Sequence, residues 1–146
     1  MRIIDLFSGV GGLTFGFYYR KYKDHFVRNR KNQFVFANEY NPLAAKAYSE
    51  NYPDIPMKNC DIKSLKESDI RKWIGSEPVD LIIGGPPCQS FSTVGQRNYD
   101  EKAQLYTEYL RVLKIARPKM FLFENVRGIL SMREIFYKRD AAGNIL

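Results

Sequence analysis

Short apolar runs alternate along the chain with longer segments in which apolar residues recur at helical spacing. The runs are apolar at nearly every position, which is typical of parallel strands covered on both faces. They predict strands at residues 2–7, 33–38, 57–60, 79–83 and 120–124. The periodic segments between them predict helices at residues 12–22, 42–51, 68–74 and 102–116. This alternation predicts an α/β fold with a doubly wound, Rossmann-like parallel sheet.

Two of the predicted helices carry further local signals. Asn41 precedes Pro42, and a capping residue followed by proline at the first helical position favours a helix start. Ile70, Trp73 and Ile74 share one face of the third predicted helix, so we expect the lone tryptophan in the core.

The size of the chain limits the number of domains, and its charge suggests a class of partner. The chain has 146 residues, 45% of them hydrophobic, and a formal charge of +7, which favours one domain over residues 1–146. The charge suits a polyanionic partner, although a solvated basic surface explains it equally well. Positive charge is dense in residues 20–32. We interpret this stretch as a solvated connection, with an arm that contacts phosphates as the alternative.

The cysteine and histidine content argues against two kinds of site. Cys60 and Cys88 are the only cysteines and His25 is the only histidine, so we expect neither a disulfide framework nor a bound metal. The apolar start of the chain is too short for a signal peptide, and no stretch approaches membrane-spanning length. A cytoplasmic, nucleoid-associated protein is therefore expected.

A glycine-rich turn follows the first predicted strand. Residues 5–13 read DLFSGVGGL and lead into a helix, which is the topology in which backbone approaches a nucleotide-like ligand closely. Thr14 stands where the dinucleotide pattern GxGxxG has its third glycine, which argues against a nicotinamide cofactor. A tight turn without a ligand is the alternative for this motif alone.

Two carboxylates come just after the second and third predicted strands. Because the carboxyl ends of parallel strands meet at one edge of a sheet, Glu39 and Asp61 are expected beside the glycine turn. One carboxylate can accept hydrogen bonds from both ribose hydroxyls, and the other can accept a hydrogen bond from an exocyclic adenine amine. Either acid could instead cap a helix. Together with the glycine turn they indicate a site for an adenosine group.

The fourth predicted strand leads into a stiff loop that carries a cysteine. Residues 84–92 read GGPPCQSFS, and two glycines with two prolines make a sharp turn that presents Cys88 at the same sheet edge. Cys60 fits the role of a small core hydrophobe, whereas Cys88 does not, because its neighbours are loop formers. Glu124 stands at the end of the fifth predicted strand and brings another acid to this edge.

These motifs resemble those of the cytosine-C5 DNA methyltransferase family along nearly the whole chain. Residues 5–12 match its first motif, residues 85–89 (GPPCQ) its catalytic motif and residues 124–126 (ENV) its glutamate motif, in the expected order. The resemblance implies a sheet of the S-adenosylmethionine-dependent methyltransferase type, incomplete at the C-terminus, with S-adenosylmethionine as cofactor and S-adenosylhomocysteine as product.

The resemblance also assigns roles to individual positions. Cofactor contacts are implied for Phe7, Gly9 and Gly11 in the turn, Glu39 on the ribose, Tyr40 and Ile62 on the adenine ring, Asp61 on the adenine amine, and Pro87 and Leu105 in the pocket wall. Cys88 is the implied nucleophile, adding to C6 of a flipped cytosine, and Glu124 the group that acts at N3. Contacts to the substrate DNA are expected from Gln89, Ser92 and Arg97, the last to a phosphate or simply to solvent.

The resemblance covers less than a family member usually contains. The arginine motif, the target-recognition region and the last motif are missing, which predicts either a fragment or one subunit of an enzyme split over two chains. In both cases we expect methyl transfer to duplex DNA within a restriction-modification system. The alternatives are a tRNA cytosine methyltransferase, distinguished by its transfer to tRNA, and a non-catalytic module that binds a cofactor or partner.

Overall fold

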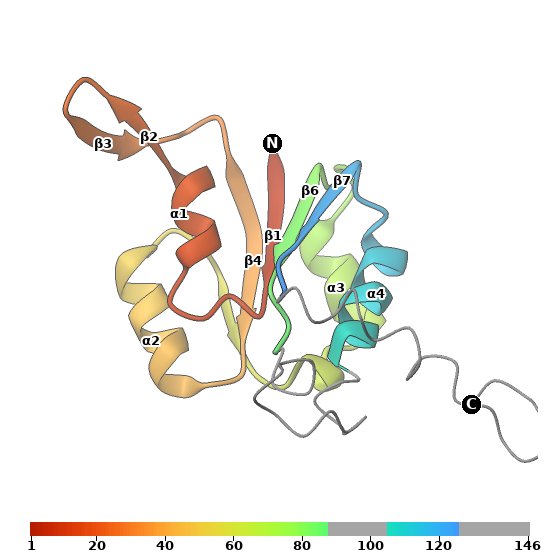
Figure 1. Ribbon diagram of the computed structural model, residues 1–146. Helices are drawn as coiled ribbons and strands as arrows, with labels where there is room; N and C mark the ends of the chain where they lie inside the picture. The colour runs from red at the N-terminus through yellow and green to blue at the C-terminus, as the bar shows by residue number, and fades with distance from the viewer. Residues whose placement is uncertain (88–104, 126–146) are drawn as a thin grey trace, which may run out of the picture.

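A five-stranded parallel sheet forms the centre of the molecule (Figure 1). The computed structural model describes residues 1–87 and 105–125. The sheet order is β5-β4-β1-β6-β7, and its strands are β1 Arg2–Leu6, β4 Gln33–Glu39, β5 Met57–Asn59, β6 Leu81–Gly84 and β7 Met120–Phe123. The helices are α1 Gly12–Tyr18, α2 Pro42–Asn51, α3 Glu67–Ile74, α4 Leu105–Ala116 and the 3-10 turn η1 Ile62–Ser64. A separate antiparallel hairpin consists of β2 Tyr19–Tyr22 and β3 His25–Arg28.

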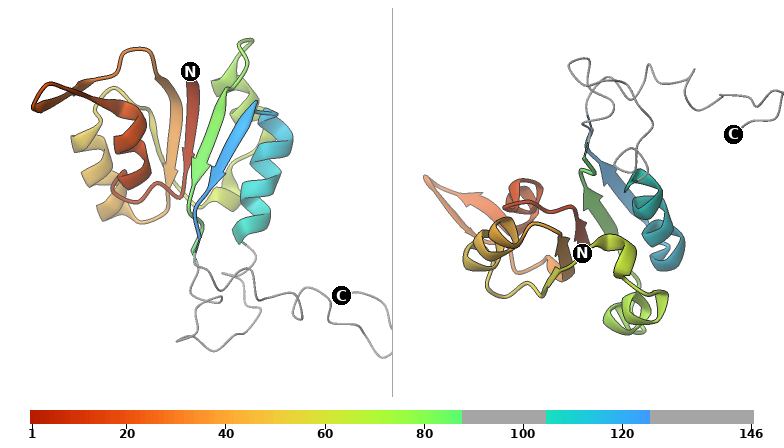
Figure 2. Two further views of the ribbon diagram at one scale, coloured as in Figure 1. Left: turned by 45° about the horizontal axis from the view of Figure 1, so that its top comes forward. Right: turned by 90° about the horizontal axis from the view of Figure 1, so that it is seen from below.

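Helices cover both faces of the sheet. α1 and α2 lie on one face and α3 and α4 on the other, and the two views of Figure 2 agree on this. β1 supplies fully buried side chains to both cores, with Ile3 in the α1–α2 core and Ile4 and Leu6 in the α3–α4 core. The chain adds β4 and β5 on one side of β1 and then β6 and β7 on the other. This change of direction places the ligand-binding crevice of a doubly wound sheet at the carboxyl end of β1.

The predicted fold class is confirmed, and all five predicted strands are present. Their observed bounds differ from the predicted ones by two residues or fewer. Asn41 caps α2 by accepting from the backbone N–H groups of Leu43 and Ala44, as expected. Trp73 packs edge-on against Phe36, 5.0 Å between ring centroids, and joins the α3–α4 core as predicted.

The first helix and the basic segment after it differ from the prediction. α1 ends at Tyr18, not at residue 22, and the chain turns directly into the β2–β3 hairpin. Residues 20–28, interpreted above as part of a solvated connection, are exposed or half-buried but form the two strands and the turn of this hairpin. Aromatic and aliphatic residues recur among the charged ones there, a composition that suits strands, and Lys23 adopts the positive φ of 53° that the tight turn requires.

None of the helices in the described part of the chain is both long and apolar enough to cross a membrane.

Candidate functional site

The glycine turn leaves β1 in a conformation that few side chains tolerate. Phe7, Gly9 and Gly11 all have positive φ, at 55°, 54° and 95°. The ring of Tyr52 fills the space beside Gly11, where an added Cβ would lie 2.1 Å from a ring carbon. Tyr52 also donates a hydrogen bond of 2.8 Å to the carbonyl of Gly11. Glycine is required at position 11 both by the backbone angle and by the close approach of this ring.

A buried polar network lies beneath the turn. Asp5 is fully buried in β1 and accepts a hydrogen bond from the hydroxyl of Thr14 in α1. Since that hydroxyl has a single hydrogen, the Tyr48 hydroxyl 2.8 Å away donates to the Thr14 oxygen. Burial raises the pKa of Asp5 to about 7; the Thr14 hydrogen bond lowers it and the nearby Glu39 charge raises it further. The network connects β1, α1 and α2 directly below the turn.

Sequence reasoning missed this network. Its one visible signal is Asp5, an acid inside the otherwise apolar run of residues 3–7. Thr14 and Tyr48 gave no signal, because both occur at positions that suit an ordinary helix.

Glu39 holds the turn in place from the end of β4. One carboxylate oxygen accepts from the backbone N–H of Gly9 at 2.8 Å, and the other accepts from the backbone N–H of Asn41 at 2.7 Å. Each carboxylate oxygen can accept a further hydrogen bond, so this clamp leaves capacity for a ligand hydroxyl. The expected proximity of Glu39 to the glycine turn is thus present in the structure.

A pocket of about 740 Å³ opens at the carboxyl edge of the sheet. Its lining includes seven of the nine residues expected to contact the cofactor, and it is formed by Phe7, Asn38, Glu39, Tyr40, Asn41, Asp61, Ile62, Lys63, Gly85, Pro87 and Leu105. The other two, Gly9 and Gly11, belong to the turn that leads into α1. Asn38, Asn41 and Lys63 were not anticipated. Asn38 donates to the carbonyls of Lys58 and Cys60 and so fixes the segment that leads to Asp61.

Asp61 caps a helical turn and also lines the pocket. It is the cap of η1, where one carboxylate oxygen accepts from the backbone N–H of Lys63 at 2.9 Å. The same residue lines the pocket and is exposed to it. Capping fixes the position of the carboxylate, and within the described residues its second oxygen remains able to accept from a donor on a ligand.

Glu124 lies against the start of the cysteine loop. Its backbone N–H donates to the carbonyl of Gly84, and its carboxylate occupies the space beside Gly85, 2.6 Å from where a Cβ would be. Asn125 donates to the carbonyl of Pro86 at 3.2 Å. The glutamate motif and the start of the loop are therefore in contact at the edge that holds the pocket. Cys88, Gln89, Ser92 and Arg97 lie outside the described residues.

Comparison with protein families gives one match that spans almost the whole chain. Residues 1–139 match the model of the C-5 cytosine-specific DNA methylase family. Among curated relatives, the type II methyltransferase M.AgeI of Thalassovita gelatinovora is 42% identical over 135 residues, covering 90% of this chain and 29% of that protein. M.NgoPII of Neisseria gonorrhoeae is 40% identical over 135 residues, covering 91% and 35%.

Solved structures of methyltransferases also resemble this chain. The crystal structure of a protein described as a DNA modification methyltransferase from an E. coli prophage superposes with a TM-score of 0.72 and 33% identity, covering 92% of this chain and 35% of that one. The Dnmt2 methyltransferase of S. pombe superposes with a TM-score of 0.61 and 26% identity, covering 88% and 35%. The chain thus spans about a third of the length of these relatives.

Proposed function

Because the chain belongs to the C-5 cytosine-specific DNA methylase family, we propose that it forms the cofactor-binding and catalytic part of an enzyme that methylates C5 of cytosine in duplex DNA. The observation that supports this proposal most directly is that three features lie at one edge of the sheet. They are the glycine turn held by Glu39, the pocket beside that turn, and Glu124 packed on Gly85. The type II methyltransferases among the relatives support a role in a restriction-modification system.

The pocket fits S-adenosylmethionine by size and by lining. Its volume of about 740 Å³ is within the range of small-molecule sites. Glu39 and Asp61 supply acceptors for ribose hydroxyls and an adenine amine, while Ile62, Tyr40 and Leu105 supply apolar contact for the ring. Phe7, at the start of the turn, offers a ring face to a sulfonium group. When bound, S-adenosylmethionine supplies a methyl group with the reactivity of an electrophile.

The chemistry assigned to the protein begins with a thiolate. Sγ of Cys88 forms a bond to C6 of the cytosine, and the electrons of the C5–C6 double bond move toward N3. Glu124 holds a proton at N3 and so offsets the charge that develops on the ring. C5 would then take the methyl group, and the methyl–sulfur bond of S-adenosylmethionine would break to leave S-adenosylhomocysteine. Loss of the C5 proton to a base and departure of the Cys88 thiolate restore the aromatic ring and the enzyme.

This chemistry requires the target base to leave the helix. A cytosine inside duplex DNA hides both faces of its ring by stacking, so the base must be flipped into the site at a cost of a few kcal/mol. We assign Gln89, Ser92 and Arg97 to contacts with the flipped base and its backbone.

The proposed enzyme includes more polypeptide than these 146 residues. The relatives are about three times as long as the segment they share with this chain. We propose that DNA target recognition is supplied by a further segment or by a second chain.

Substitution of the two cysteines tests the proposal in the complete enzyme. Cys88→Ser is expected to reduce methyl transfer to duplex DNA by at least about 10³-fold and to leave S-adenosylmethionine binding within about twofold by calorimetry. Cys60→Ser, in the α3–α4 core, is the matched control and keeps transfer. Parent enzyme, but not Cys88→Ser, is expected to form a covalent complex with DNA containing 5-fluorocytosine. Full turnover by Cys88→Ser, or transfer to tRNA in place of duplex DNA, would overturn the proposal.

A further inference from the structure

Most of the net positive charge of the chain comes from one short segment. Residues 19–32 contain six Lys or Arg and one Asp, which is a net +5 of the formal +7 of the whole chain. The other 132 residues are nearly neutral. This segment is the β2–β3 hairpin and the turn that leads into β4, and we call residues 19–31 the basic hairpin surface.

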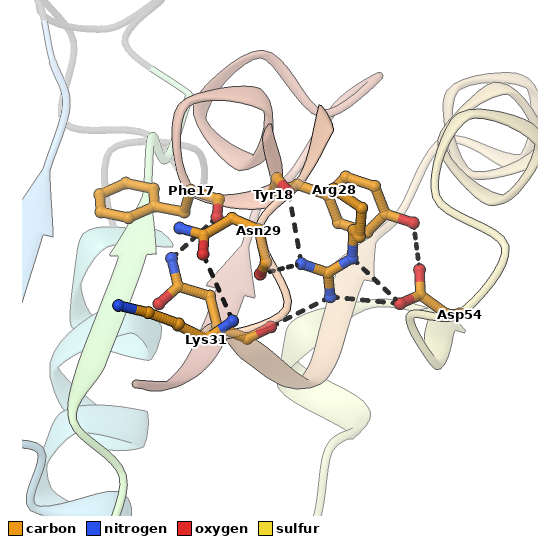
Figure 3. A network of polar contacts seen from close by, with 7 residues as sticks. Phe17, Tyr18, Arg28, Asn29, Lys31 and Asp54 are labelled. Carbon is orange, nitrogen blue, oxygen red and sulfur yellow. Dashed lines mark hydrogen bonds and ion pairs between the residues drawn. The ribbon is translucent and has the colours of Figure 1, made fainter. Parts of the chain in front are cut away.

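The base of the hairpin is fixed to the body of the protein by Arg28 (Figure 3). Its guanidinium lies 3.9 Å over the ring of Tyr18 and pairs with Asp54 at 3.2 Å. The same group donates to the carbonyls of Tyr18, Asn29 and Asn32. Tyr18 in turn donates to Asp54. The hairpin is therefore presented in a defined orientation, and a partner does not have to order it on binding.

The other cations of the hairpin point to solvent. Arg20, Lys21, Lys23, Arg30 and Lys31 are all exposed. Within the described ranges, Arg28 is the only member of the segment in an ion pair.

Exposed aromatic rings separate these charges. Arg20 and Lys23 each lie within 6 Å of the Tyr22 ring, at 5.7 and 5.8 Å, and Phe26 is more than half exposed. An open hollow of about 820 Å³ is lined by Arg20, Tyr22, Val27, Arg28, Asn29, Arg30 and Lys31. The surface is concave, cationic and partly aromatic.

The basic hairpin surface lies away from the candidate site. In Figure 1 and the left view of Figure 2 the hairpin lies toward the same end of the sheet as the start of β1, and the strands run from there toward the opposite end. The terminal amine of Met1 donates to the carbonyl of Lys31 at 2.7 Å, which fixes the end of the surface at the amino edge. The pocket and Glu124 are at the carboxyl edge. The surface is therefore a separate feature of the molecule.

We propose that the basic hairpin surface binds the phosphate backbone of duplex DNA, on a stretch of DNA other than the one that presents the target cytosine. Several closely spaced, exposed cations match a polyanion with regular phosphates, and neutralising those phosphates releases condensed counterions. The binding is independent of base sequence and holds the protein on DNA. The choice of DNA as the polyanion rests on the proposed function, but the binding itself requires no methyl transfer.

A duplex of only A·T pairs, about 30 base pairs long, tests the proposal because it contains no cytosine to methylate. The hairpin variant Arg20→Gln/Lys21→Gln/Lys23→Gln is compared with Lys66→Gln/Lys72→Gln/Lys114→Gln, which removes three exposed cations from the α3–α4 side. Fluorescence anisotropy between about 50 and 200 mM salt is expected to show roughly tenfold weaker binding for the hairpin variant and a salt slope smaller by about 2 to 3. The control variant is expected to bind like the parent protein.

Three outcomes would overturn the proposal. Equal weakening of both variants would show an effect of net charge alone, and no weakening of the hairpin variant would show that the surface does not bind DNA. A hairpin-dependent interaction with polyglutamate but not with the duplex would identify an acidic protein as the partner. Arg30→Gln/Lys31→Gln, across the hollow, provides a second variant, and circular dichroism confirms folding of each. Failure of the Cys88→Ser test would leave these binding results unchanged, so the two proposals fail separately.

Discussion

Asp5 is a carboxyl group held inside the protein directly below the glycine turn, and its ionisation opposes folding. Its pKa in the folded state, about 7, is higher than the usual 3.8. The folded protein therefore binds more protons than the unfolded chain between about pH 4 and 7, and stability falls as the pH rises through this range. The stability that neutral Asp5 contributes to the folded protein is fully present below about pH 4 and is lost above about pH 7. At about 1.4 kcal/mol per pKa unit, the upper limit of this loss is about 4 kcal/mol.

Replacing Asp5 with asparagine tests this linkage. The asparagine side chain cannot ionise but retains an oxygen that accepts from Thr14, so Asp5→Asn is expected to flatten the dependence of unfolding free energy on pH between about 4 and 7. Urea unfolding at several pH values, followed by circular dichroism, measures the slope. Asp54→Asn is the control, because the hydrogen bonds of Asp54 to Tyr18 and Arg28 outweigh its burial and lower its pKa. A slope in Asp5→Asn as steep as in the parent would assign the dependence to another group.

At the scale of elements, the sequence predicted the features that depend on the local pattern of apolar residues and on the topology of the sheet. The five parallel strands were predictable because apolar runs of that length suit buried strands. The convergence of Phe7, Glu39 and Asp61 followed from the rule that parallel strands end at one edge, and the pocket contains all three. Their chemical roles remain predictions.

The hairpin could not be predicted in this way. Its aromatic residues fit a helix face as well as a strand, and the dense charge around them resembled a solvated loop. Contacts distant in sequence decide the outcome: Tyr18 packs edge-on against Tyr52 at 4.9 Å, and Arg28 reaches Asp54. The Asp5 network escaped prediction for the same reason, since Thr14 and Tyr48 come from different helices.

The hairpin should consequently loosen when its anchor is removed. Arg28→Gln deletes the ion pair with Asp54, the stacking on Tyr18 and hydrogen bonds to backbone carbonyls. We expect amides of β2 and β3 to exchange with solvent about tenfold faster, which corresponds to about 1.4 kcal/mol of local stability, while amides of β1 are unchanged. Hydrogen exchange followed by mass spectrometry resolves these segments.

Arg71→Gln is the matched control for this prediction. Arg71 pairs with Glu67 one turn away on the exposed side of α3, and such pairs contribute little. The rate of amide exchange in the hairpin of Arg71→Gln should equal that in the parent protein. If Arg28→Gln also left the hairpin unchanged, the cross-strand contacts of β2 and β3 would be sufficient to hold it.

At the scale of the whole molecule, the two end strands of the described sheet, β5 and β7, differ from each other. β5, at one end, has only three residues, of which the polar Asn59 is exposed, and such a short end strand discourages pairing with another strand. β7, at the other end, pairs with β6 and exposes Met120, Phe121 and Leu122, at 55%, 62% and 37% of their surface. An apolar end strand of this kind is a surface for association.

Self-association of the 146-residue chain is therefore expected to depend on β7. Phe121→Lys places a charge on this strand and should reduce concentration-dependent association, measured by sedimentation velocity, and the fluorescence of a bound hydrophobic dye. Leu43→Lys on α2 is the control, because Leu43 is 78% exposed but is isolated from β7. Equal effects of the two substitutions would indicate a general benefit of added charge. A specific effect of Phe121→Lys would identify β7 as the associating surface.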